Sequence, residues 1–227
     1  MIKPLLVFDM DGVLVDVAES YRETIHQTVL HFTGSGISRE AIQDYKNQGG
    51  WNDDWQLSHH IITRRGIEAR FDDVVEYFQG LFHGKDGTPG LILREVWIAR
   101  PGVLEKLADT FRFAIFTGRM KWEAEFTLRR FAQRLTFEPI IGLHEVENLK
   151  PAPDGLLKIR DANSGCPMWY IGDTVDDARC AQSAGVPFVG IASPGKPRHC
   201  ELVALFHQQQ ARAVIDDINQ LEQVLQS

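Results

Sequence analysis

Two carboxylates, Asp9 and Asp11, lie directly after the short apolar run 5–8 and directly before Gly12. The apolar run predicts a buried strand, because it is short and is followed by a turn signal. Side chains alternate along a strand, so both carboxylates can point the same way just beyond its end. Two negative charges this close repel each other unless a cation lies between them or one carboxylate holds a proton. The pair is therefore either a solvated acidic turn or a site for cation binding and proton transfer.

Further polar side chains follow the strands predicted at 111–116, 137–141 and 168–171. The carboxyl ends of parallel strands lie at one edge of a sheet, and ligands of such sheets bind there. We therefore expect one cluster of side chains at this edge, made of the opening pair and Thr117, Lys150, Asp173, Asp176 and Asp177.

The chemistry of these groups fits a divalent cation and a phosphate. Mg²⁺ prefers a few carboxylates together with water and phosphate oxygens. A hydroxyl and an ammonium are suitable donors to phosphate. Each residue also has a structural interpretation: Thr117 or Asp173 as a helix cap, Lys150 as a solvated loop lysine, and Asp176 or Asp177 as first-turn helix acids. Taken together, the structural interpretations leave the shared edge unexplained.

The order of predicted elements indicates an α/β fold, a doubly wound, Rossmann-like parallel sheet. Strands and helices alternate from residue 98 onwards. Helices are predicted at 121–132, 176–184 and 221–225, and a further one opens at Pro153 and Asp154. Apolar residues at helical spacing after Gly12 predict an all-helical segment over about 15–95. We expect a core domain of residues 1–14 and 98–227, with a helical cap domain, 15–97, inserted after the first strand. Hinges are expected near 13–17 and 94–101.

Composition narrows the functional classes. A chain of 227 residues with 44% hydrophobic residues can bury a core, and a net charge of −7 gives no basic footprint for nucleic acid. The cysteines, Cys166, Cys180 and Cys200, are too few and too scattered for a disulfide framework, which favours a reduced, cytoplasmic location. No apolar run is long enough to cross a membrane. We expect a monomer or homodimer without nucleic-acid or membrane partners.

Four motifs resemble the haloacid dehalogenase superfamily. They are Asp9-Met10-Asp11-Gly12, Phe116-Thr117-Gly118, Lys150-Pro151-Ala152-Pro153 and Gly172-Asp173-Thr174-Val175-Asp176-Asp177. The segment 178–187 is also similar to this superfamily. The resemblance is to phosphatase-type members with a helical cap, the phosphoglycolate-phosphatase-like group, and it covers residues 1–15 and about 98–227. The cap matches only in position and helical character.

The resemblance implies a role for each motif. Asp9 would be the nucleophile that forms an aspartyl-phosphate, and Asp11 would be the general acid and base. Neighbouring carboxylates are expected to favour the protonated form of Asp11. Phosphate would be held by Thr117, Gly118 and Lys150. Mg²⁺ would be held by Asp9, Asp173 and the backbone carbonyl of Asp11. Asp177, or Asp176 in its place, would support either the metal or Lys150.

The implied function is Mg²⁺-dependent hydrolysis of a small phosphorylated metabolite. The second acid, Asp11, favours phosphoryl transfer over dehalogenation within the superfamily. A sugar phosphomutase would use the same motifs. A receiver-like signalling domain would carry its phosphorylated aspartate on the third strand, and a binding protein without catalysis is a further alternative. For substrate selection we expect cap residues in and near the loop 47–55, namely Gly50, Trp51, Asn52, Trp55 and Arg65, although packing tryptophans and a surface arginine would look the same.

Overall fold

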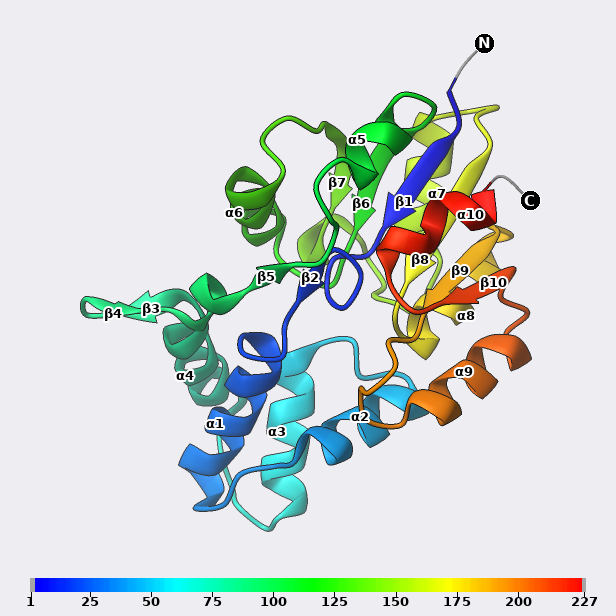
Figure 1. The fold of residues 1–227 in the computed structure, drawn as a ribbon. Helices are drawn as coiled ribbons and strands as arrows, with labels where there is room; N and C mark the ends of the chain where they lie inside the picture. Colours follow the sequence, from blue (N-terminus) through cyan, green and yellow to red (C-terminus); the bar gives the residue numbers. More distant parts are fainter. Residues whose placement is uncertain (1–2, 226–227) are drawn as a thin grey trace. The chain divides into compact units, whose positions relative to one another are not determined.

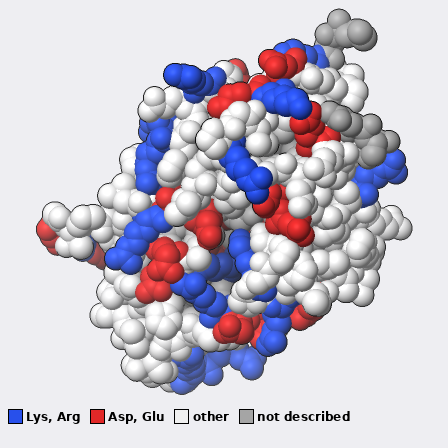
Figure 2. Space-filling view, in the orientation of Figure 1, with Lys and Arg blue, Asp and Glu red and all other residues white. Residues whose placement is uncertain are grey.

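The computed structural model describes residues 3–225 and divides the chain into two compact units. Unit 1 comprises Met1–Val15 and Trp97–Ser227, and unit 2 comprises Asp16–Val96. No described helix is long and apolar enough to span a bilayer. On the face visible in Figure 2, acidic and basic side chains are interspersed rather than gathered by sign.

Unit 1 is built on a parallel six-stranded sheet in the order β10-β9-β8-β1-β6-β7, with β1 near its middle (Figure 1). On β1, Val7 is paired with Ala114 on one side and Tyr170 on the other. The strands are β1 (Leu5–Phe8), β6 (Arg112–Phe116), β7 (Phe137–Ile141), β8 (Met168–Gly172), β9 (Phe188–Ile191) and β10 (Ala213–Ile215). The observed sheet confirms the predicted α/β class, because crossover helices connect parallel strands.

Helices cover the sheet of unit 1, and one buried cluster joins them to it. In this cluster Leu156 and Ile159 of α7 and the small Ala178 and Ala181 of α8 pack with strand residues such as Tyr170. The helices are α5 (Val103–Ala108), α6 (Lys121–Phe131), α7 (Asp154–Ala162), α8 (Val175–Ala184), α9 (His199–Gln208) and α10 (Leu221–Leu225), with short 3₁₀ turns η2 (Leu143–Glu145) and η3 (Ile218–Gln220). Of these, α5 and α9 were not anticipated from the sequence.

Unit 2 is mainly helical, with buried Ile25, Val29, Leu57 and Phe78 in its interior. Its helices are α1 (Tyr21–Thr33), α2 (Arg39–Gln48), α3 (Asp54–Arg64) and α4 (Phe71–His83), followed by a 3₁₀ turn, η1 (Leu91–Arg94). Ser38 caps α2, because its hydroxyl accepts a hydrogen bond from the backbone N–H of Ala41.

The prediction of an all-helical segment over 15–95 is wrong in two places. Strands β3 (Gly84–Lys85) and β4 (Thr88–Pro89) form a hairpin, and β2 (Val15–Asp16) pairs with β5 (Val96–Trp97). The hairpin turns at Asp86 and Gly87, which both have positive φ, 51° and 81°. Asp-Gly is a strong signal for such a turn, but two-residue strands carry no periodicity. The loop predicted at 47–55 is also shorter, since α2 continues to Gln48 and α3 begins at Asp54.

Candidate active site

The candidate site lies at the carboxyl edge of the sheet in unit 1, where β1, β6 and β8 end side by side. Asp9 continues the ladder beyond β1, and its backbone N–H donates to Ile171 O at 2.8 Å. Thr117 follows β6 and donates its N–H to Ile141 O of β7 at 3.0 Å. Asp173 directly follows β8. Parallel register therefore brings these three strand ends to one place, as the sequence predicted.

Lys150, from the loop between β7 and α7, is buried at the centre of this edge. Its ammonium donates to Asp9 Oδ1 at 2.8 Å, Asp177 Oδ1 at 2.7 Å and Tyr170 Oη at 2.9 Å. Its side chain is only 2% exposed. Burial alone would lower the pKa of this ammonium, but the carboxylates of Asp177 and Asp9 outweigh it and raise the pKa. Lys150 is thus a permanently charged lysine rather than a solvated loop residue.

Asp177 anchors this lysine from the first turn of α8. Thr174, the N-cap, donates its hydroxyl and its backbone N–H to Asp177 Oδ2 at 2.6 and 3.0 Å. Burial would raise the pKa of Asp177, but Lys150, Thr174 and Tyr170 bind the ionised form and hold the pKa below its usual range. Asp176 is also buried, but its carboxylate points elsewhere, 3.9 Å from Arg179. Of the two acids, only Asp177 contacts Lys150 among the described residues.

The ionised form of Asp9 is less favourable than that of Asp177. Burial raises the pKa of the Asp9 carboxyl above its usual range, the Lys150 ammonium opposes the shift, and the nearby acids Asp177, Asp11 and Asp173 add to it. Lys150 binds Oδ1, while Oδ2 has no hydrogen-bond partner among the described residues. The site therefore has more negative charge than its one lysine neutralises, with one oxygen left available for bonding.

The acidic cluster has the donors that a hard divalent cation requires. Asp9, Asp173 and Asp177 each offer one carboxylate oxygen within 4.8 Å of the others. Gly12 makes the close approach of Asp173 possible, because a Cβ at Gly12 would lie 1.8 Å from Asp173 Oδ2. Gly12 also has a φ of +73°, which side chains rarely adopt. Both the donor set and the glycine cradle fit a bound cation.

Asp11 is held by an arginine to which the sequence analysis gave no role. Arg119 donates Nε and Nη2 to Asp11 Oδ1 at 2.8 and 2.5 Å, and Nη1 to Thr127 Oγ1 at 3.1 Å. The arginine side chain is 1% exposed, whereas that of Asp11 is 29% exposed. From the sequence, only carboxylates were expected next to Asp11, and the Arg119 guanidinium corrects this expectation. The available signal for Arg119 was its position directly after the motif Phe116-Thr117-Gly118.

Tyr170 is a second residue of this site that was not predicted from the sequence. Its hydroxyl donates to Asp177 Oδ1 at 2.7 Å and accepts from Lys150, and burial raises its pKa well above the usual value. A buried tyrosine needs a partner for its hydroxyl, and that need was the available signal.

The turn after β6 holds the two remaining core candidates. Thr117 is buried, and its hydroxyl accepts from the backbone N–H of Arg119 at 3.3 Å. Gly118 follows it, half-buried. The helix-cap interpretations do not hold, because α6 begins only at Lys121, and Thr174 rather than Asp173 caps α8.

The candidates in unit 2 gather around the loop between α2 and α3. Gly50, Trp51 and Asn52 lie in this loop, and Trp55 lies in the first turn of α3. The buried Lys46 holds the loop by donating to Trp51 O and Asp54 Oδ1, both at 2.6 Å. The Asn52 side-chain nitrogen is buried with no hydrogen-bond partner among the described residues.

Arg65, the last cap candidate, is engaged within unit 2. Its guanidinium donates to Thr33 Oγ1 at 2.9 Å, Ser35 O and Oγ, and Gly36 O at 3.0 Å. These contacts fasten the end of α3 to the turn between α1 and α2. Arg65 therefore has a structural role within unit 2.

Comparison with known proteins gives a consistent result. The sequence profile described as haloacid dehalogenase-like hydrolase matches residues 6–191. An imidazoleglycerol-phosphate dehydratase from Phytophthora nicotianae is 31% identical over 197 residues, which are 83% of this chain but 43% of that protein. The chain thus spans less than half of that relative.

Two further comparisons cover most of both chains. A phosphoglycolate phosphatase from Rhodobacter capsulatus is 26% identical over 195 residues, 82% of this chain and 83% of that protein. In fold, the chain is similar to a crystal structure described as a haloacid dehalogenase-like hydrolase from Bacteroides fragilis. That match has a TM-score of 0.73 and 23% identity, and it covers 97% of this chain and 100% of the other.

Proposed function

Because the chain belongs to the haloacid dehalogenase-like hydrolase family, we propose that it is a Mg²⁺-dependent phosphatase that hydrolyses a small phosphorylated metabolite through an aspartyl-phosphate on Asp9. The family match confirms the expected enzyme class, a hydrolase of this superfamily. The observation that best supports the phosphatase proposal is the buried contact of Lys150 with both Asp9 and Asp177, next to Asp173.

In the first step, the available Oδ2 of Asp9 attacks phosphorus. A bond forms between this oxygen and phosphorus, and the bond from phosphorus to the leaving oxygen breaks. Asp11 donates its proton to the leaving oxygen. In the second step, Asp11 accepts a proton from water, whose oxygen attacks phosphorus and releases inorganic phosphate. The carboxylate of Asp9 is thereby regenerated.

Lys150 would act through its charge and its hold on Asp9. Its three N–H donors already serve Asp9, Asp177 and Tyr170, so a phosphate must compete for them. The fixed ammonium orients Oδ1 of Asp9 and thereby directs Oδ2 toward substrate. We propose that Thr117 and Gly118, in the turn after β6, provide the direct contacts to phosphoryl oxygens.

Asp9, Asp173 and the backbone carbonyl of Asp11 would hold Mg²⁺. When bound, this ion supplies positive charge that keeps the cluster ionised and offsets the charge of the phosphoryl group. Asp177 belongs to the same acidic cluster, but its contacts with Lys150 and Tyr170 assign it the task of positioning the lysine.

Arg119 would position the acid/base. Its bidentate contact fixes Asp11 Oδ1 and leaves the half-exposed carboxylate its second oxygen for proton transfer.

We further propose that residues 15–97 form a cap domain that selects the substrate. The unpartnered Asn52 nitrogen supports this proposal, because a buried donor without an acceptor is costly unless a ligand provides one. Gly50, Trp51 and Trp55 would shape the surroundings of that donor.

Hydrolysis of p-nitrophenyl phosphate by purified protein tests the proposal. Activity should require Mg²⁺ and disappear in excess chelator. Asp9→Asn should abolish turnover, while Asp161→Asn, at an exposed acid of the same unit, should leave it unchanged. Full activity of Asp9→Asn would contradict the proposal. If a sugar phosphate yields an isomeric sugar phosphate instead of inorganic phosphate, the enzyme is a phosphomutase.

A further inference from the structure

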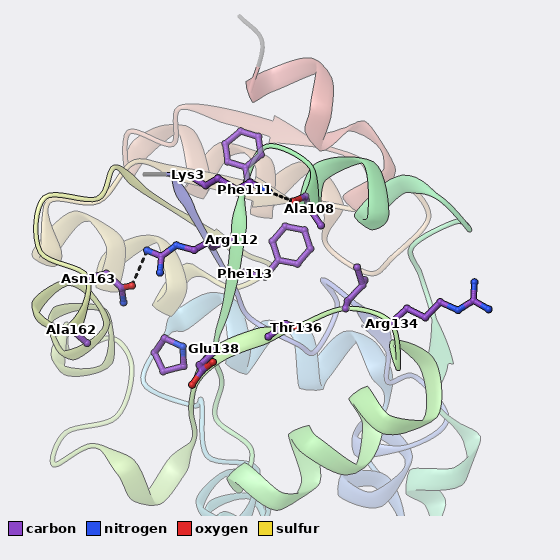
Figure 3. A pocket seen from close by; sticks show the side chains of 12 residues that line it. Lys3, Ala108, Phe111, Arg112, Phe113, Arg134, Thr136, Glu138, Ala162 and Asn163 are labelled. Carbon is purple, nitrogen blue, oxygen red and sulfur yellow. Dashed lines mark hydrogen bonds between the residues drawn. The ribbon is translucent and has the colours of Figure 1, made fainter. Parts of the chain in front are cut away.

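A hollow in unit 1 lies at the edge of the sheet opposite to the candidate active site (Figure 3). Its walls come from the starts of β6 and β7, the segments before them, and the end of α7. Its volume is about 610 Å³, within the range of small-molecule sites. Ligands of parallel sheets normally bind at the carboxyl ends of the strands, so this hollow at the amino ends has no part in the proposed phosphatase chemistry.

The charged residues that line the hollow are mainly basic. They are Lys3, Arg112 and Arg134, against the single acid Glu138. The whole chain has a net charge of −7, so this local excess of positive charge runs against the composition. A concave surface of one sign concentrates ligands of the opposite sign.

Two of these cations are already held in place. Arg112 Nη2 donates to Asn163 Oδ1 at 2.9 Å, and Lys3 Nζ donates to Ala108 O at 2.9 Å (Figure 3). Neither cation forms an ion pair with a described carboxylate, and each has N–H donors left over. A fixed guanidinium loses little further freedom when it binds an anion.

The walls between the cations are apolar. The ring of Phe113 is buried and that of Phe111 half-buried, and Leu135 and Pro139 complete the lining. In Figure 3, the ring of Phe113 lies between Arg112 and Arg134, whose side chain extends outward, and the ring of Phe111 lies next to the hydrogen bond between Lys3 and Ala108. The hollow therefore offers apolar contact to a ligand body and charge to a ligand head.

We propose that this hollow is a second ligand site, which binds a small organic anion with an aromatic or otherwise apolar body. Arg112 is the principal anion contact, Lys3 adds charge, and the phenylalanine rings receive the body. Carboxylates, sulfonates and phosphate monoesters share this chemistry. The site stands independently of the proposed phosphatase function.

Binding can be measured by amide NMR titration with benzenesulfonate, benzoate and phenylphosphonate, and with the neutral benzamide. The amides of Arg112, Thr136 and Asn163 should shift with the anions, and benzamide should bind at least threefold more weakly. Comparison of the three anions distinguishes the head groups. If phenylphosphonate shifts only the amides around Asp9, it binds at the candidate active site. That result would argue against the hollow as a site for phosphate esters.

Two variants and one control distinguish the contribution of charge from that of the shape of the hollow. Arg112→Gln should weaken binding about three- to tenfold, as expected for one partly exposed ionic contact. Arg212→Gln removes the same charge from another exposed arginine, directly before β10 and outside the hollow, and should leave affinity unchanged. Ala162→Trp, at an exposed lining position, keeps every charge but fills the space and should also weaken binding.

Equal affinity of the wild type, Arg112→Gln and Ala162→Trp would overturn the proposal, as would equal binding of benzamide and benzoate. A loss of affinity in Arg212→Gln as large as in Arg112→Gln would also contradict it, because binding would then depend on net charge alone.

Discussion

The hydroxyl of Tyr170 should contribute measurably to the stability of unit 1. This single group donates to Asp177 Oδ1 at 2.7 Å and accepts from Lys150 Nζ at 2.9 Å, and both partners are buried ions. Tyr170→Phe removes the oxygen, keeps the ring in the core, and leaves one N–H of the lysine with only the longer contact to Phe116 O, at 3.3 Å. Hydrogen bonds to charged groups contribute ~1.5–3 kcal/mol each. Since two are lost but both ions keep their mutual contact, we expect the free energy of unfolding to fall by ~2–3 kcal/mol.

Urea unfolding followed by fluorescence and by circular dichroism measures this loss. The control is Tyr45→Phe, because the Tyr45 hydroxyl is half-buried in unit 2 without a hydrogen bond to any described residue. Tyr45→Phe should change the free energy of unfolding by no more than ~0.5 kcal/mol, the usual range for a substitution outside such hydrogen-bond networks. If Tyr170→Phe costs no more than Tyr45→Phe, the hydroxyl does not stabilise the buried ions, and our description of the network is wrong.

Three further predictions concern the glycine cradle, the arginine and a helix cap. Gly12→Ala should lower both turnover and Mg²⁺ affinity, measured by titration calorimetry, because its Cβ would meet Asp173 Oδ2 at 1.8 Å. Gly185→Ala, with a φ of +66° but nothing within 4 Å of its Cβ, should lose stability only, and equal Mg²⁺ affinities in the two variants would refute the cradle. Arg119→Gln should reduce kcat far more than KM, with partial rescue by Arg119→Lys; a change in KM alone would refute its positioning role. Burial raises the pKa of Asp53 above 3.8, although its helix-capping hydrogen bonds oppose this. The folded state therefore binds more protons, and stability should decline as pH rises from 3.8 through the folded-state pKa. Asp53→Asn keeps the cap and should show a smaller decline in pH-dependent urea melts; an unchanged decline would contradict the assignment.

The sequence predicted the positions of the strand-end residues because their placement follows from topology. Asp9, Thr117 and Asp173 each come directly after an apolar run, and parallel strands bring such positions to one edge. The lysine could be added because it lies in the loop that leaves the third predicted strand. The order of apolar runs and polar residues along the chain was therefore sufficient to predict this part of the site.

Other contacts depend on packing between segments far apart in the chain. Asp11 and Arg119 are separated by 108 residues, and no local pattern shows that the guanidinium reaches back to the first strand. In the sequence Tyr170 looked like an ordinary core residue, because the hydrogen bonds of its hydroxyl with Lys150 and Asp177 form only in the folded structure. The choice between Asp176 and Asp177 likewise depends on the rotation of α8, which its N-cap fixes.

The central claim, an aspartyl-phosphate on Asp9, can be tested most directly by trapping it. With p-nitrophenyl phosphate the leaving group needs little protonation, so Asp11→Asn should form the intermediate but lack the base that hydrolyses it. Rapid acid quench and peptide mass spectrometry should then find a phosphoryl group on the peptide that contains Asp9. Nitrophenol release by Asp11→Asn without any phosphoryl group on this peptide would contradict the account.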